Sequence, residues 1–225
     1  IGHPECLNLL LENGGTANHS DAFGETPLFA SVRNCDFYSS NLLLTFGADP
    51  NVVSEDIRTP LHIAAASFHK SLDLTQLLLD NGALVNTMDR FQRSPFTVGL
   101  DTYIQVLQQD MSIPRCLVRH GTQLNDEKTW EALRWSVDAI GNFDIMKLVV
   151  DAGLDLKSLP WLQDYLQRPV GRRMWYTRTD YDQEAEVAFR EIVIHHLKNA
   201  SPLSQIVRTF IRSYFISISK GKSIY

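Results

Sequence analysis

A pattern that recurs at a nearly constant spacing constrains the fold of this chain more than any other feature. Each copy opens with Thr or Ser followed by Pro, and the openings are Thr26-Pro27-Leu28-Phe29, Thr59-Pro60-Leu61-His62 and Ser94-Pro95-Phe96. They begin 33 and 35 residues apart, and each is followed by an apolar run that ends at Gly47, Gly82 or Gly121. A period of about 20 to 50 residues is typical of solenoids, whose units bury their apolar faces against their neighbours.

The residue types within one copy predict its local structure. Thr or Ser can cap the start of a helix, and Pro in the first turn loses no hydrogen bond there. Four residues after each Pro stands Ser31, Ala64 or Gly99, a small residue that lets two antiparallel helices approach closely. The closing Gly suits a left-handed helix end. Each copy is therefore expected to form a helix, a turn, a second helix and an extended loop.

This pattern resembles the ankyrin repeat, which opens with TPLHxA and closes with LLxxGAxxN at a period of about 33 residues. The resemblance implies an all-α fold, an ankyrin-repeat solenoid of about five helix-turn-helix repeats. Residues 1–157 are expected to form this domain, with repeats at 4–20, 21–53, 54–88, 89–125 and 126–157. The first is only the second half of a repeat, and the fifth lacks the opening Pro. Because the chain begins with Ile1 and not Met, we expect a piece of a longer protein.

The repeats differ in length, because the distance from opening to closing Gly grows from 21 residues in the second repeat to 23 and 27 in the next two. The extra residues are expected in loops between the paired helices, at 68–71 and 103–112. Such insertions on one face of a solenoid can mark a binding surface, and drift in loop length explains them equally well.

The last residues, 201–225, carry a different pattern. They follow a segment at 158–200 that we interpret as a helical cap and connector, and they open an amphipathic helix at Ser201-Pro202. This helix resembles the start of a SOCS box, whose motif positions are filled by Leu203, Val207, Arg208, Ile211 and Arg212. Val207 stands where that family commonly has Cys, and the sequence ends at Tyr225, before the half of the box that contacts the cullin. We therefore interpret 201–225 as a truncated SOCS box.

In module order the chain resembles the ankyrin repeat and SOCS box protein family. The resemblance implies a substrate-recognition adaptor of a cullin-RING E3 ubiquitin ligase that is not itself an enzyme. The ankyrin repeats would bind an unknown protein target, and the SOCS box would bind elongin B and elongin C next to a cullin scaffold. The elongin-binding residues implied are Leu203, Ile206, Val207, Phe210 and Ile211.

Two alternatives remain open. Ser201-Pro202-Leu203 could open another ankyrin repeat, but the residue four after the Pro is the bulky Ile206. The spacing also disagrees, because 48 residues separate Gly153 from Ser201, whereas 12 separate Gly47 from Thr59. The second alternative is an ankyrin scaffold that binds a partner without any ligase, since its repeats would look the same.

The composition and the motifs that the sequence lacks disfavour several classes of function. A net charge of −5 and a pI near 5.8 disfavour nucleic acid as a partner. The sequence has no apolar run of about 18 residues, which a membrane span would need, and no leader typical of secretion. We therefore expect a cytoplasmic protein, which can also be nuclear. The cysteines, Cys6, Cys35 and Cys116, form no metal-binding pair, and no catalytic or phosphate-loop motif is complete. We therefore expect no cofactor, no metal and no membrane or nucleic-acid partner.

Target binding is expected at the loop tips that precede the openings. The residues three positions before each opening Thr or Ser are Phe23, Asp56 and Phe91. Exposed aromatic residues are typical anchors at protein interfaces. Packing of one tip against the next explains the aromatic residues equally well. His62, within an opening, is expected to be a structural hydrogen-bonding residue.

Overall fold

The structure is a computed structural model, and it describes residues 4–67, 71–106, 111–137, 143–154, 156, 159–167 and 183–199. In these ranges the chain is helical and contains no strand. The helices are α1 (Pro4–Glu12), α2 (Pro27–Arg33), α3 (Phe37–Thr45), α4 (Pro60–Ala66), α5 (Leu72–Asp80), α6 (Pro95–Val106), α7 (Ser112–Arg119), α8 (Glu127–Trp135), α9 (Asp144–Asp151), α10 (Leu162–Gln167) and α11 (Gln183–Asn199). The all-α fold predicted from the repeats is confirmed. None of the described helices is both long and apolar enough to cross a membrane.

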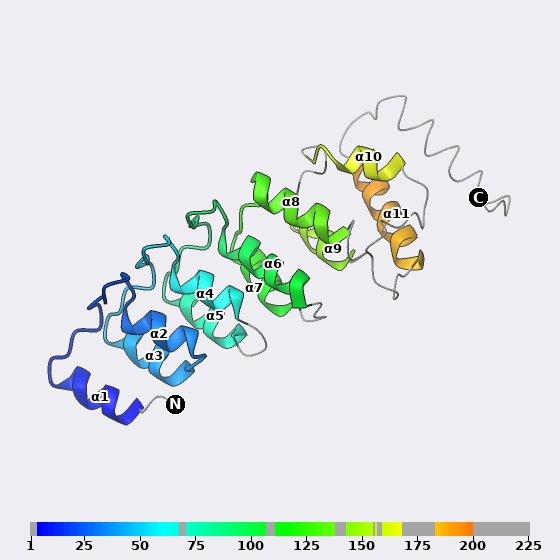
Figure 1. The fold of residues 1–225 in the computed structure, drawn as a ribbon. Coiled ribbons are helices and arrows are strands. Elements are labelled where there is room, and N and C mark those ends of the chain that lie inside the picture. Colours follow the sequence, from blue (N-terminus) through cyan, green and yellow to red (C-terminus); the bar gives the residue numbers. More distant parts are fainter. Residues whose placement is uncertain are drawn as a thin grey trace. The chain divides into compact units, whose positions relative to one another are not determined.

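The chain divides into two compact units, Ile1–Trp135 and Ser136–Tyr225. In the first unit the pairs α2/α3, α4/α5 and α6/α7 follow one another in chain order, and each pair packs against the next (Figure 1). Leu43, Leu78 and Leu117, one from the second helix of each pair, are at most 1% exposed and lie in the shared core. This is the helix-turn-helix solenoid that the spacing predicts.

The openings and closings behave largely as their residue types predict. The prolines that follow Thr26 and Thr59 lie in the first turn of α2 and of α4. Ser94 caps α6, because its Oγ accepts a hydrogen bond from the Thr97 backbone N–H at 3.2 Å. Thr26 does not cap α2 through its side chain, and its buried Oγ1 has no hydrogen-bond partner among the described residues.

The closing glycines confirm the predicted left-handed helix ends. Gly47 and Gly82 have φ angles of +81° and +85°, and a Cβ added to either would meet no atom within 4 Å. Any cost of a side chain there is therefore a backbone cost and not a clash.

We expect Gly47→Val and Gly82→Val each to lower the free energy of unfolding by about 1 kcal/mol or more, because a β-branched residue strains a left-handed backbone. Urea unfolding of each variant measures the change. Gly47→Asn is the matched control and should cost less, since Asn tolerates this conformation better than other side chains. Equal unfolding midpoints for Gly47→Val and the parent chain would show that the helix end is not left-handed.

Asparagines that follow the closing glycines tie each repeat to the next. Asn18 Nδ2 donates to the Gly47 carbonyl at 2.9 Å, and its Oδ1 accepts from the Asp49 N–H at 2.8 Å. Asn51 makes the same two bonds to Gly82 and Leu84, at 3.0 and 2.8 Å. An amide side chain can donate and accept at once, which gives the final Asn of the repeat pattern a physical reason.

The fourth repeat differs from its prediction. The extra residues were expected in a loop from Tyr103 to Ser112, but α6 has 12 residues where α2 and α4 have 7. Tyr103 lies within α6 and is 6% exposed, so burial of its ring accompanies the longer helix. The other expected insertion, at 68–71, lies outside the described residues except for Ser71.

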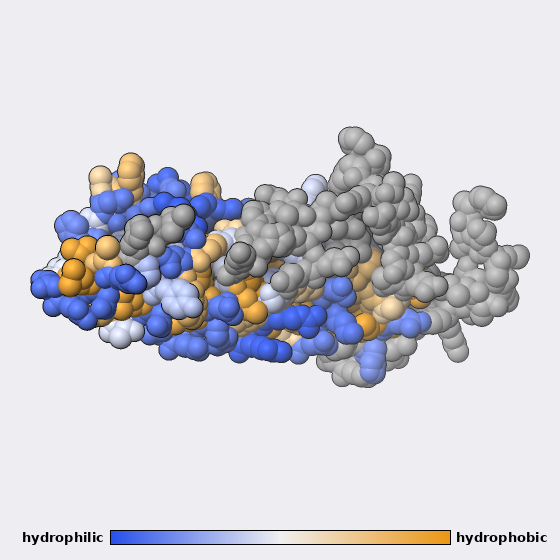
Figure 2. All heavy atoms as spheres, turned by 90° about the horizontal axis from the view of Figure 1, so that it is seen from below, coloured by the Kyte–Doolittle hydropathy of each residue, from blue (hydrophilic) through white to orange (hydrophobic). Residues whose placement is uncertain are grey.

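Helix α1 presents apolar residues that the later repeats bury. Leu10 is 65% exposed, whereas Leu43 and Leu78, at the same distance from their closing Gly, are 1% and 0% exposed. In those repeats the preceding helix of the pair packs against the helix that carries the leucine. Figure 2 shows orange, hydrophobic residues at the surface of this end of the first unit, at the left of the view. No described helix covers this face of α1.

The second unit has a core of its own. Helix α11 packs on α9, and the Phe143 and Phe189 rings stack with centroids 5.0 Å apart. A buried ion pair joins Arg190 to Glu186, and the Tyr165 hydroxyl donates to the same carboxylate at 3.2 Å. Burial, followed by the charge of Glu186, raises the pKa of Tyr165, so this hydroxyl stays protonated. The boundary between the units falls between α8 and α9, inside the predicted fifth repeat.

Candidate protein-binding surface

The loops before α2, α4 and α6 share one backbone conformation. In each loop a backbone N–H donates to the carbonyl four residues later, from Asp21 to Glu25, Ser54 to Arg58 and Asp89 to Arg93, at 2.9 to 3.0 Å. The residue before the last of each loop has a positive φ, +73° at Gly24, +57° at Ile57 and +58° at Gln92. The repeat pattern thus produces three equivalent tight turns.

Neighbouring loops are joined at their tips. The Glu55 N–H donates to the Phe23 carbonyl at 3.0 Å, and the Arg90 N–H donates to the Asp56 carbonyl at 3.1 Å. A Cβ added to Gly24 would lie 3.3 Å from the Val53 carbonyl oxygen, so Gly permits this close approach. We call residues 21–25, 54–58 and 89–93 the tip row, because hydrogen bonds make them one continuous edge.

Large apolar side chains project from the tip row. Phe23 is 64% exposed, Ile57 is 48% exposed and Phe91 is 55% exposed. The Arg93 guanidinium carbon lies 5.0 Å from the Phe91 ring centroid, a cation–π contact. The aromatic residues proposed as target anchors therefore lie at the surface, while their binding role stays a prediction.

The third predicted tip residue, Asp56, is paired within the row. Its Oδ1 lies 2.8 Å from Arg90 Nη1, and both side chains are about half exposed. An exposed ion pair contributes little to stability, so this pair is able to open toward a partner.

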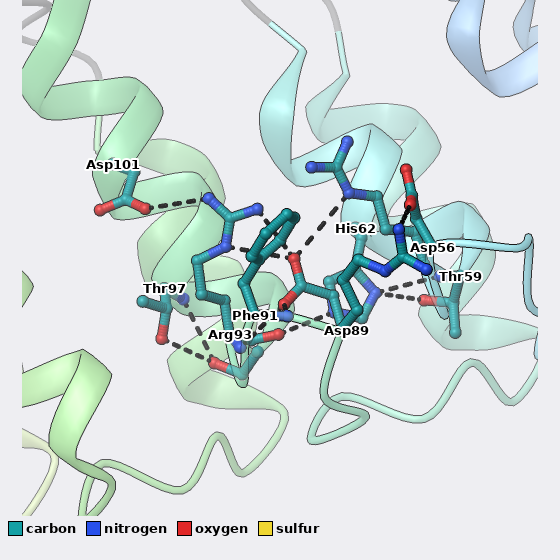
Figure 3. A network of polar contacts seen from close by, with 11 residues as sticks. Asp56, Thr59, His62, Asp89, Phe91, Arg93, Thr97 and Asp101 are labelled. Carbon is teal, nitrogen blue, oxygen red and sulfur yellow. Dashed lines mark hydrogen bonds and ion pairs between the residues drawn. The ribbon is translucent and has the colours of Figure 1, made fainter.

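A buried carboxylate holds the third loop of the tip row together (Figure 3). The Asp89 side chain is fully buried, and Oδ1 accepts from the backbone N–H groups of Phe91 and Arg93 at 2.8 and 3.0 Å. Its Oδ2 accepts from Arg93 Nε and Nη2 at 3.1 and 2.9 Å. Burial raises the pKa of Asp89, but the bonds from Arg93 and the backbone outweigh it and leave the pKa below its usual value. The carboxylate is therefore ionised.

Arg93 extends this network toward α6. Its Nη1 lies 3.5 Å from Asp101 Oδ2, so the guanidinium bridges Asp89 and Asp101. Burial raises the pKa of Asp101, and Arg93 opposes that change. One arginine is thus held by carboxylates from the loop and from the helix that follows it.

His62 confirms its expected structural role. The backbone N–H of Thr59 donates to His62 Nδ1 at 3.1 Å, so the proton of the neutral ring lies on Nε2. Nε2 then donates to the Arg93 carbonyl of the next loop at 3.1 Å. Burial lowers the pKa of His62, which keeps the ring neutral near pH 7. The histidine therefore joins its own helix start to the neighbouring repeat.

This lowered pKa predicts a pH effect on stability. As the pH falls below about 6.5, the unfolded chain takes up a proton at His62 that the native chain resists, so the free energy of unfolding decreases. Above that pH the contribution is constant. We expect the urea midpoint of His62→Gln to fall less than that of the parent between pH 7.5 and 5.5. The control His19→Gln, at an exposed position, should keep the parent's pH dependence, and a parent-like slope in His62→Gln would contradict the assignment.

Ile57 and Arg58 are surface features that the sequence analysis missed. Ile57 occupies a left-handed position where Gly24 stands in the previous loop, and a β-branched residue there is unusual. Spacing from the opening Thr could have marked Ile57 as a tip residue, but its exposure depends on the turn.

In the described ranges no group of three or more His, Cys, Asp or Glu side chains is arranged to hold a metal ion.

The fold and the tip row together define an ankyrin-repeat protein region, and comparison with known proteins agrees. Residues 1–89 match the family model for ankyrin repeats (3 copies). The chain therefore contains ankyrin repeats, which imply a role in protein–protein interaction and a protein partner.

Curated proteins are similar to parts of this chain. Over 108 residues the chain is 35% identical to the human Ankyrin repeat and SOCS box protein 16, covering 46% of this chain and 23% of the relative. It is 32% identical over 122 residues to ankyrin repeat protein FPV031 of Fowlpox virus (strain NVSL), covering 54% and 35%. It is 33% identical over 85 residues to E3 ubiquitin-protein ligase KEG of Arabidopsis thaliana, covering 36% and 5%. The matches thus span about a third or less of each relative's length.

The predicted elongin-binding residues, Leu203, Ile206, Val207, Phe210 and Ile211, lie outside the described residues. Their role and the interpretation of 201–225 as a SOCS box stay predictions from the sequence pattern.

Proposed function

We propose that this chain is the substrate-recognition adaptor of a cullin-RING E3 ubiquitin ligase. Its ankyrin repeats hold a protein target along the tip row, and residues 201–225 bind elongin B and elongin C. The chain performs no catalytic step in this scheme. A cullin scaffold joins the complex through the adaptor and places the target near the ubiquitin-transferring components.

The alignment with Ankyrin repeat and SOCS box protein 16 carries this proposal. That relative's name contains both modules, and the pattern from Leu203 to Arg212 resembles the second one. The exposed tip row supports the target-binding half, because Phe23 and Phe91 offer aromatic anchors beside charged groups.

Co-elution with purified elongin B–C tests the proposal. We expect residues 1–225 to elute with elongin B–C as one complex in size-exclusion chromatography, and a chain that ends at residue 200 to elute separately. The shorter chain must keep the helical circular-dichroism spectrum of the ankyrin repeats for the comparison to be valid. If the longer chain also elutes alone, the ligase proposal fails and an ankyrin scaffold becomes the better explanation.

A further inference from the structure

The Arg58 side chain, in the middle loop of the tip row, makes no hydrogen bond to another described residue. Its nearest charged partner is Asp89, whose Oδ2 lies 3.9 Å from Arg58 Nε, beyond hydrogen-bond distance. Nε itself is buried and has no hydrogen-bond partner in the part of the chain that the structure describes. The side chain is 34% exposed, and among its nitrogens only Nε is buried without a partner, so the Nη1 and Nη2 end of the guanidinium is the part that reaches the surface.

The structure explains why Asp89 does not satisfy Arg58. Both oxygens of Asp89 already accept hydrogen bonds, two from backbone N–H groups and two from Arg93 (Figure 3). The other arginines of the row are occupied as well, since Arg90 pairs with Asp56 and Arg93 with Asp89 and Asp101. The Nη groups of Arg58 therefore keep N–H donors that are available to a ligand.

We propose that Arg58 receives a carboxylate of the protein target, with an apolar residue of the same linear segment packing against Ile57 or Phe91. This inference rests on the proposed target-binding role of the tip row and names the chemistry of the segment that it binds. A guanidinium presents its N–H groups in a planar fork that matches a carboxylate. Ile57, next to Arg58, and Phe91, whose N–H binds Asp89, supply exposed apolar surface on the same row.

Charge favours a carboxylate over a phosphate at this position. Asp89 is buried and ionised beside Arg58, and Glu55 lies on the same row. A doubly charged phosphate would meet stronger repulsion from these carboxylates than a singly charged carboxylate would.

Glu55 is the competing feature, because it would attract a basic segment. Its side chain is exposed, and an exposed carboxylate is satisfied by water. The Arg58 side chain is about two-thirds buried and its Nη groups bond no described residue, so this partly desolvated guanidinium gains more from a new hydrogen-bonding partner. The balance favours an acidic segment.

Selection from a phage-displayed library of random 12-residue peptides tests this inference on the full chain. We expect the selected peptides to be enriched in Asp or Glu next to Leu, Ile or Phe. Arg58→Gln should lose the acidic enrichment and keep the apolar one, and Arg58→Lys should retain part of it because Lys keeps the charge without the fork. The matched control Arg119→Gln, at an exposed arginine at the end of α7, should select the same peptides as the parent.

One selected peptide then gives the magnitude. Replacing its acidic residue by the corresponding amide should weaken binding to the parent about tenfold or more, and should change binding to Arg58→Gln little. Enrichment of Lys or Arg, equal acidic enrichment in Arg58→Gln, or no enriched peptide at all overturns the inference. Thermal melts must show Arg58→Gln folded, and if it is not, Arg58→Lys carries the comparison. Elongin B–C binding by the same preparations separates this result from the ligase proposal, since a parent chain that binds elongin B–C but shows no acidic preference contradicts only the role of Arg58.

Discussion

Val207→Asp is expected to abolish the binding of elongin B and elongin C. The SOCS-box resemblance places Val207 in the apolar contact with the adaptor, and Asp there would bury a carboxylate without a partner. Leu203→Ala should weaken binding about ten- to hundredfold, because full burial of Leu contributes roughly 1.5 to 3 kcal/mol. Biolayer interferometry with immobilised elongin B–C measures both variants against the parent.

Val207→Cys is the matched control for this prediction. It should bind nearly as well as the parent, since the contact requires a small apolar side chain. If residues 201–225 instead pack within the chain itself, Leu203→Ala will lower the melting temperature of the chain. Parent-like affinity in Val207→Asp would show that this helix face does not contact the adaptor.

The largest expected effect on stability comes from Asp89→Asn. The buried carboxylate accepts two backbone N–H groups and two N–H groups of Arg93, and an amide would turn a donor toward some of them. Breaking a buried pair of this kind costs about 2 to 4 kcal/mol. Urea unfolding of the parent and the variant measures this loss.

Asp56→Asn serves as the control for Asp89→Asn. It removes the partner of Arg90 from an exposed pair, and exposed pairs contribute about 0 to 1 kcal/mol. The prediction fails if the two variants are equally stable, because Asp89 would then contribute no more than a surface charge.

The features that local chemistry determines were predictable from the sequence. Pro at a helix start and Gly at a left-handed helix end act within a few residues, so the period located α2 to α7 and the φ values of Gly47 and Gly82. The position of His62 in the opening likewise predicted its structural hydrogen bonds. The tip residues Phe23 and Phe91 followed from their distance to the openings, and their exposure agrees with that reasoning.

Features that depend on contacts between repeats were not predictable. Asp89 and Arg58 belong to loops 31 residues apart, so the 3.9 Å between Asp89 Oδ2 and Arg58 Nε depends on how neighbouring repeats pack. Tyr103 was placed in a loop because helix length was read from spacing alone, whereas its burial is set by tertiary packing. Gly99 was assigned to the contact within a helix pair, but a Cβ there would lie 3.5 Å from the Ala65 carbonyl oxygen of α4, in the neighbouring repeat.

The central claim is that one chain combines ankyrin repeats for target recognition with a C-terminal adaptor-binding helix. Isothermal titration calorimetry of purified elongin B–C into residues 1–225 tests it most directly. The account predicts saturable one-to-one binding that disappears when the chain ends at residue 200. No binding heat at any of several temperatures, with the ankyrin repeats folded, would contradict it.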